Sequence, residues 1–163
     1  WSRTLGTSTH DRGNDIAIDS SGNIYVTGQT YGSLNGNAYS GDSDLFLMKY
    51  NSSGTLSWVQ QLGTSGTDVA EALAIDNNGD IYITGYTTGS LDSNSNTGGE
   101  DIFLVKYNSS GVKQWTKQSG TSGGDRGYGV TVDNSSNIYV TGSISSGNGD
   151  IFLMKFNSDG DLQ

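Results

Sequence analysis

The sequence lacks cysteine and proline, and it is poor in basic residues and in long apolar runs. The absence of cysteine excludes disulfide bonds. Only 8 Lys and Arg residues stand against 17 Asp and Glu residues, so the net charge of −9 disfavours nucleic acids and anionic membranes as partners. No apolar run approaches the ~20 residues of a membrane-spanning helix, so we expect no membrane span. The first residue is Trp1 rather than Met, and we therefore expect the native N-terminus to lie upstream.

Small polar residues dominate the chain, and the apolar residues occur in short clusters. Hydrophobic residues make up 32% of the chain and charged residues only 15%, a composition near that of disordered proteins. The apolar clusters are rich in β-branched and aromatic residues, and stretches of Gly, Ser, Thr and Asn separate them. This pattern predicts short strands joined by tight turns rather than disorder.

One segment of sequence occurs three times in tandem. Trp1, Trp58 and Trp115 are each 57 residues apart, and the same motifs follow each Trp in the same order. These motifs are Gly-Thr-Ser (6–8, 63–65, 120–122), an apolar run ending in Asp (16–19, 73–76, 130–133), Ile-Tyr-Val/Ile-Thr-Gly (24–28, 81–85, 138–142) and a final apolar run that starts with Asp (44–50, 101–107, 150–156). The repeats span residues 1–57, 58–114 and 115–163, and the third has a shortened variable segment.

Each repeat contains four segments of strand length joined by short hairpins that carry Gly. Along Leu45–Met48 both faces of the predicted strand are apolar, which is typical of a strand that is covered on both sides. Sheets stacked face to face, as in the blades of a β-propeller, produce this pattern. The sequence therefore predicts an all-β, propeller-type array of three four-stranded antiparallel blades that is open at both ends.

The succession Trp…Gly-Thr-Ser…Asp-Ser-Ser-Gly-Asn-Ile-Tyr-Val-Thr-Gly…Asp-x-Phe-Leu-x-Lys-Tyr-Asn-Ser-Ser-Gly resembles the bacterial SBBP repeat, named for the seven-bladed β-propeller. The Asp-x-x-Gly-Asn-x-Tyr stretch is also similar to NHL-type propeller repeats. The resemblance covers the whole chain and implies large, exported bacterial proteins, with an extracellular or cell-surface location. It implies no catalytic residues.

Three blades do not close a propeller, which needs about four to eight. We expect the segment from Trp1 to about Gly6 to be a strand without a blade, and the last blade to lack its outermost strand. The chain is then part of a longer array, or two copies close a six-bladed ring, or the strand of Trp1 completes the last blade of the next copy. The residues expected at this assembly edge are Trp1, Leu5, Phe152, Met154 and Phe156.

Any ligand site is expected on the variable loops, because long loops on a rigid scaffold commonly carry binding residues. Their Tyr, Asn and Asp side chains suit sugar hydroxyls or a protein partner, although the same residues are more typical of solvated loops. The candidates are Tyr31, Asn35, Asn37, Tyr39, Asp92, Asn94 and Asn96.

A second group of candidates lies in the connections between blades, at the mouth of the central channel of a propeller. It comprises His10, Asp11, Arg12, Asp68, Asp125 and Arg126. The Asp recurs in every repeat, which favours a structural role in binding turn amides, and the arginines are expected to pair with neighbouring Asp residues. His10 has no nucleophile placed beside it by sequence, so we expect no enzymatic activity.

No metal or cofactor is expected from the sequence. Residues 157–161 faintly resemble a calcium-binding loop but lack its bidentate Glu, so only weak Ca²⁺ binding to the acidic surface remains open. The sequence thus predicts a non-catalytic extracellular scaffold or surface protein that assembles with other copies of itself or with further blades. The alternative is an adhesin- or lectin-like propeller that binds a glycan or a surface protein.

Overall fold

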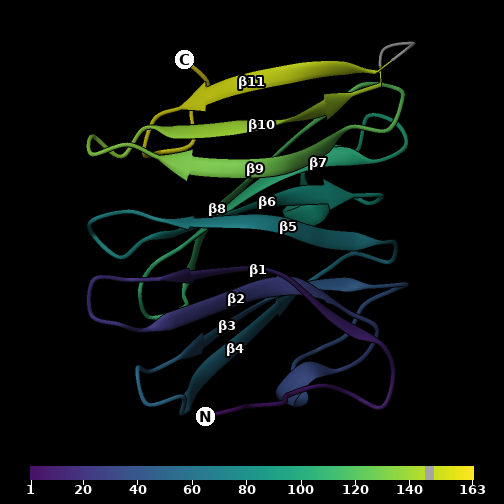
Figure 1. The fold of residues 1–163 in the computed structure, drawn as a ribbon. Helices are drawn as coiled ribbons and strands as arrows, with labels where there is room; N and C mark the ends of the chain where they lie inside the picture. Colours follow the sequence, from purple (N-terminus) through teal and green to yellow (C-terminus); the bar gives the residue numbers. More distant parts are fainter. Residues whose placement is uncertain (146–148) are drawn as a thin grey trace.

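The computed structural model describes residues 1–145 and 149–163. These residues form three antiparallel sheets that stack one above another, from the N-terminal sheet at the bottom of Figure 1 to the C-terminal sheet at the top. The predicted all-β array of antiparallel blades, open at both ends, is confirmed. Among the described residues, no helix is long and apolar enough to cross a membrane.

Each sheet is a meander in which consecutive strands are hydrogen-bonded neighbours. Blade 1 contains β1 (Asp11–Ile18), β2 (Ile24–Thr30), β3 (Asp44–Tyr50) and β4 (Leu56–Leu62). Blade 2 contains β5 (Asp68–Ile75), β6 (Ile81–Thr87), β7 (Asp101–Tyr107) and β8 (Lys113–Ser119). Blade 3 contains β9 (Arg126–Val132), β10 (Ile138–Ile144) and β11 (Asp150–Phe156). The variable segments of blades 1 and 2 carry the short 3-10 helices η1 (Leu34–Gly36) and η2 (Leu91–Ser93).

An aspartate closes the first hairpin of each blade. Asp19 Oδ1 accepts hydrogen bonds from the backbone N–H groups of Ser21 and Asn23, both at 2.9 Å, and Gly22 takes a φ of 78° in this turn. The hydroxyl of Tyr25, on the following strand, donates to the other oxygen of Asp19 at 3.1 Å. Equivalent bonds recur in the other two blades, so the Asp that ends each apolar run holds a turn.

The core consists of the layers between sheets. On β3, Leu45 faces blade 2 and Phe46 faces the opposite way; on β7, Phe103 faces blade 1 and Leu104 faces blade 3. This arrangement explains the strands that are apolar on both sides, because a central blade is covered by a neighbour on each face. Each fully buried side chain of this size stabilises the fold by roughly 1.5–3 kcal/mol.

Polar contacts fix the blades relative to one another. The Asn14 side-chain amide donates to the Ala70 carbonyl at 2.8 Å, and Asp15 Oδ2 accepts from the Leu73 backbone N–H at 2.8 Å. Both contacts join β1 to β5, the strands that lie in front in Figure 1. They satisfy polar groups that the stacked apolar faces would otherwise bury without partners.

The two ends of the chain differ from the regular blades. In the described part of blade 3 three strands are paired, and Leu162 adds one further antiparallel bridge to Phe156. The segment Trp1–Gly6, expected to be a strand, has no strand pairing and passes beneath blade 1 (Figure 1). A strand requires a neighbouring strand to bond with, and residues 1–145 and 149–163 place none beside this segment.

A glycine on the second strand of each blade allows a close approach of two backbones. In blade 1, the register of β1 and β2 shifts between Gly13 and Asp15, which marks a β-bulge. A Cβ on Gly28, opposite this bulge, would lie 1.9 Å from the Arg12 carbonyl oxygen, whereas a Cβ on Gly13 would find its nearest atom at 3.6 Å. The glycine of the Ile-Tyr-Val-Thr-Gly motif is therefore required by sterics.

We predict that Gly28→Ala lowers the free energy of unfolding by about 1–3 kcal/mol, because the strands must separate to admit the methyl group. The control is Gly13→Ala, on the partner strand of the same bulge, which should change stability by less than about 1 kcal/mol. Urea unfolding followed by tryptophan fluorescence measures both variants. Equal losses in the two would contradict the steric explanation.

Candidate interaction surfaces

The outer face of blade 3 is apolar and uncovered. Ile151 and Leu153 on β11 are 90% and 75% exposed. Their equivalents in blade 2, Ile102 and Leu104, are buried at 4% and 2% because blade 3 covers them. A shallow pocket of about 220 Å³ opens on this face beside Leu153 and Tyr139. Exposed apolar patches on a folded domain mark interaction sites.

The opposite end of the stack, the lower face of blade 1, is also apolar. Ile16 and Ile18 on β1 are 62% and 65% exposed, whereas Leu73, the equivalent of Ile16 in blade 2, is only 6% exposed. Trp1 and Leu5 line a pocket of about 310 Å³ on this face together with residues of β1, β2 and β3. The N-terminal segment thus covers part of the face and leaves the inner strand open.

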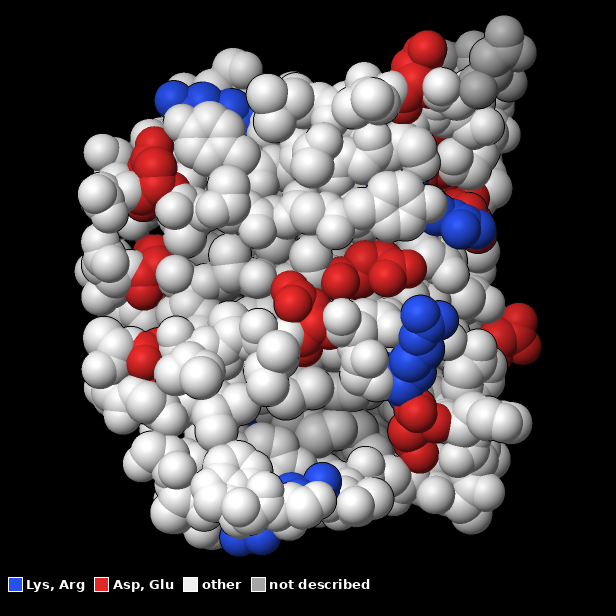
Figure 2. Space-filling model, in the orientation of Figure 1, with Lys and Arg blue, Asp and Glu red and all other residues white. Residues whose placement is uncertain are grey.

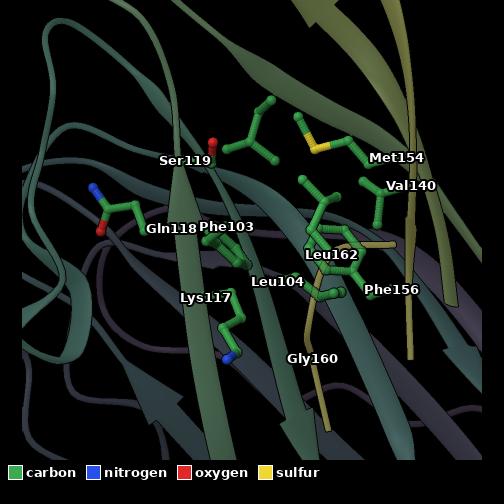
Figure 3. A pocket seen from close by; sticks show the side chains of 11 residues that line it. Phe103, Leu104, Lys117, Gln118, Ser119, Val140, Met154, Phe156, Gly160 and Leu162 are labelled. Atoms are coloured by element: carbon green, nitrogen blue, oxygen red, sulfur yellow. The ribbon is translucent and has the colours of Figure 1, made fainter. Parts of the chain in front are cut away.

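A third apolar pocket lies between blades 2 and 3, next to the edge of β11 that faces away from β10 (Figure 3). Its volume is about 240 Å³. Figure 3 shows Phe156 and Leu162 close together on one side and Lys117 and Ser119 of β8 on the other. In blades 1 and 2 the fourth strand, β4 or β8, pairs with the corresponding edge.

The residues expected at the assembly edge lie at two places in the structure. Phe152 and Phe156 are buried against blade 2, and Met154 is half-buried beside them. Trp1 and Leu5 lie on the lower face of blade 1.

Sequence reasoning missed the exposed residues Ile16, Ile18, Ile151 and Leu153. Alignment of the repeats places them at positions that are covered in blade 2. This alignment could have identified them as the positions left uncovered at the two ends of the stack. The strands are apolar on both sides, however, so the alternation of polar and apolar residues that normally identifies the outward face of a strand is absent.

The variable loops fold back onto the outermost strands. Leu34 of η1 and Leu91 of η2 are fully buried. The side-chain amide of Asn37 donates to the Leu34 carbonyl at 2.9 Å, and that of Asn94 donates to the Leu91 carbonyl at 2.8 Å. Two of the expected ligand-binding asparagines thus hold the loops themselves. The third variable segment, 143–149, includes residues 146–148, which lie outside the described residues.

The other loop candidates are distributed along the loops and do not line the three pockets above. Asn35 and Asp92 adopt left-handed backbone conformations, with φ of 53° and 52°. Burial opposes ionisation of Asp92, but its hydrogen bonds from Lys113 and Thr116 prevail and lower its pKa.

The Tyr39 hydroxyl donates to a backbone carbonyl of its own loop, and the Asn96 amide lies 3.4–3.5 Å from two loop carbonyls. Tyr31 is exposed.

The three aspartates at the connections between blades occupy equivalent positions. Asp11 accepts a hydrogen bond from the backbone N–H of Thr7 at 2.6 Å, and Asp68 accepts the same bond from Thr64 at 2.6 Å. Asp125 accepts the corresponding bond from Thr121. Burial raises the pKa of Asp68, although bonds from Thr87 and Thr64 oppose the shift. Because the equivalent Asp binds a turn amide in every blade, its role is structural.

The remaining members of this group, Arg12, Arg126 and His10, lie on the same connections. Arg126 forms a bidentate ion pair with Glu100 at 2.5 and 2.6 Å, and its guanidinium lies 4.5 Å from the centre of the Tyr86 ring. Its partner is therefore a variable-loop glutamate and not the expected Asp.

Arg12 borders the pocket beneath blade 1, and the His10 ring lies 6.4 Å from that of Tyr31. In residues 1–145 and 149–163, no three His, Asp or Glu side chains converge to hold a metal ion.

The charges form narrow groups on an otherwise uncharged surface (Figure 2). At the left end of Figure 2, acidic groups lie one above another over the turns that contain Asp19, Asp76 and Asp133. The carboxylates of Asp19, Asp76 and Asp133 accept the turn hydrogen bonds described above. The bonds from Asn137, the largest contribution, hold the pKa of Asp133 at about 2.

The stacked sheets and their apolar end faces define a propeller-type scaffold for protein interaction. The beta-propeller repeat model named SBBP matches residues 1–35, 57–96 and 114–150. This chain belongs to the SBBP beta-propeller repeat family, which confirms the family expected from the sequence.

Two curated proteins are similar to this chain. The uncharacterized WD repeat-containing protein L264 of Acanthamoeba polyphaga mimivirus is 28% identical over 182 residues, covering 87% of this chain and 13% of that protein. The regulatory protein FlaEY of Caulobacter vibrioides is 29% identical over 132 residues, covering 74% of this chain and 13% of that protein. The chain therefore spans about one eighth of the length of these two relatives.

We predict that Asp133 stabilises the chain above pH ~4 and that this contribution disappears as the pH falls towards 2. The sign follows from the lowered pKa: the folded state binds the proton less readily than the unfolded state, so acid favours unfolding. Thermal unfolding of the wild type and of Asp133→Asn between pH 2 and 7 tests this. The wild type should have the higher Tm at pH 7, and the difference should shrink below pH 4. A constant difference would contradict the prediction.

Proposed function

We propose that this chain is a non-catalytic scaffold segment of an extracellular or cell-surface protein, and that its two apolar end faces bind further blades of the same kind. The observation that carries the proposal is the exposure of Ile151 and Leu153 at positions where the other blades bury their residues against a neighbour. The occupant of such a face is another blade, because the equivalent positions of blades 1 and 2 are each covered by the next blade.

The two internal interfaces provide the template for the association. In each of them, the upper face of one blade packs against the lower face of the next. The chain exposes one upper face, on blade 3, and one lower face, on blade 1. Since these two faces are of the complementary kinds, they support head-to-tail association, which gives a ring where the rotation closes and a filament where it does not.

A protein partner fits these observations better than a glycan. The amides of Asn37 and Asn94 are used within the loops, and Asp92 is bonded to Lys113 and Thr116. The exposed end faces offer mainly aliphatic side chains, which suit another apolar sheet. One relative is named a regulatory protein and the other a WD repeat-containing protein, and neither name states an enzymatic activity.

We predict that the purified 163-residue chain self-associates and that Leu153→Glu weakens this association by about tenfold or more, because a charge would be buried in an apolar interface. Sedimentation velocity over a range of concentrations measures both chains. The control is Val112→Glu, which places the same charge on an exposed hairpin away from the end faces.

The control variant should associate like the wild type. Equal weakening by Val112→Glu would assign the effect to net charge rather than to the face. A chain that stays monomeric at all concentrations would contradict self-association.

A further inference from the structure

The contact between a tryptophan and a hairpin glycine occurs three times along the stack. Trp58 on β4 packs against Gly111 of blade 2, where a Cβ would lie 3.0 Å from the Trp58 ring. Trp115 on β8 packs in the same way against Gly160, beyond β11. Trp1 packs against Gly54 of blade 1, where a Cβ would lie 2.8 Å from its ring. Trp1 thus lies on blade 1 in the way that the outermost strand of a preceding blade lies on the blade above it.

The same tryptophans belong to a layer on the upper face of each blade. In blade 1, the rings of Tyr25 and Trp58 are 6.1 Å apart, and the Lys49 ammonium lies 5.1 Å from the Tyr25 ring. Lys49 also donates to the Ser109 carbonyl in the hairpin of blade 2, at 3.1 Å. The next blade therefore caps this layer of tyrosine, tryptophan and lysine.

Blade 2 repeats this layer with Tyr82, Trp115 and Lys106, whose ammonium lies 3.4 Å from the Ser158 carbonyl of blade 3. Blade 3 supplies the tyrosine and the lysine, with the Lys155 ammonium 5.7 Å from the Tyr139 ring. The described part of blade 3 contributes no tryptophan to this layer. Tyr139 is accordingly half-exposed, whereas Tyr25 and Tyr82 are fully buried.

A fourth strand that carries such a tryptophan would pair with the edge of β11 that faces away from β10. Leu162 bridges Phe156, as Lys113 pairs with Tyr107 in blade 2, and the Gln163 N–H donates to the Lys155 carbonyl at 2.9 Å. The fourth strand has therefore begun at its first position. The pocket of Figure 3 adjoins the rest of this edge, beside Met154.

We propose that residues 1–6 of a second copy of this chain pair with β11 as the fourth strand of blade 3. This inference rests on the proposed self-association and names the segment that performs it. The sequence Trp-Ser-Arg-Thr-Leu-Gly at residues 1–6 corresponds to Trp-Val-Gln-Gln-Leu-Gly at 58–63, which contains most of β4. The incoming strand adds backbone hydrogen bonds along an open edge, which is the general mode of strand addition.

The register follows from blade 2, where Lys106 pairs with Trp115 and Val105 pairs with Thr116. By equivalence, Lys155 pairs with Trp1 of the second copy, and Met154 pairs with Ser2.

Trp1 then completes the layer with Tyr139 while it remains on Gly54 of its own chain. Lys155 also comes within reach of the Ser52 carbonyl in the same copy as Trp1. In this proposal, one placement of the second copy above blade 3 brings all of these residue pairs together.

Cysteine cross-linking tests the register directly, because the chain has no cysteine of its own. The variant carrying Ser2→Cys and Met154→Cys should form disulfide-linked dimers and larger species under mild oxidation. In one chain these positions lie on blades 1 and 3, too far apart for an intramolecular disulfide. The control carries Ser2→Cys and Thr131→Cys, because Thr131 on β9 would lie about 14 Å from the added strand.

We expect the Ser2/Met154 variant to cross-link at least about tenfold faster than the control, because a disulfide needs Cα atoms within about 7 Å. As a second measurement, Trp1→Ala should weaken self-association in sedimentation, and Trp1→Phe should restore part of it. Trp1 is 71% exposed in the single chain, so unfolding does not explain a loss.

Two outcomes would overturn the inference and are distinguishable. Self-association with equal cross-linking of the two cysteine variants would exclude strand addition and leave face-to-face stacking intact. A chain that stays monomeric in sedimentation would exclude both the strand and the stacking.

Discussion

The packing of one two-sided apolar sheet on another is the constraint on which the rest of this structure depends. A single blade has two apolar faces and no means of covering either by itself. Blade 2 satisfies this constraint fully, because it contacts blade 1 through Phe103 and blade 3 through Leu104. Blades 1 and 3 satisfy it on one side only, and their outer faces carry the exposed apolar residues Ile16, Ile18, Ile151 and Leu153.

The polar residues of the repeat serve this stacking more than they serve ligand binding. Asp19 and Asp68 bind turn amides, and Lys49 reaches from its own blade to a carbonyl of the next. The amides of Asn37 and Asn94 also donate to carbonyls of β4 and β8, and so anchor the variable loops to the blades. The contacts that cross from one blade to the next, such as that of Lys49, fix the distance and rotation between neighbours, because a hydrogen bond tolerates little displacement. The proposed addition of further blades would use contacts of the same kind.

The sequence was sufficient for much of the fold and for less of the site. The recurrence of Trp1, Trp58 and Trp115 and the two-sided apolar strands predicted stacked antiparallel blades, because period and face pattern are properties of the local chain. Sequence reasoning also expected an incomplete last blade and a strand without a blade at Trp1, where the structure has no strand. It selected Phe152 and Phe156 for the assembly edge; the structure buries these two side chains against blade 2, and the exposed apolar side chains of β11 are Ile151 and Leu153.

The sequence by itself therefore determined the repeat, the strand type of each segment and the acidic character of the chain. The tertiary structure alone decided which side of β11 faces solvent, which polar groups the loops consume and where Trp1 lies. The physical reason is that residues alternate along a strand between two faces that are chemically alike here. Only the position of the neighbouring blade distinguishes an inward leucine from an outward one.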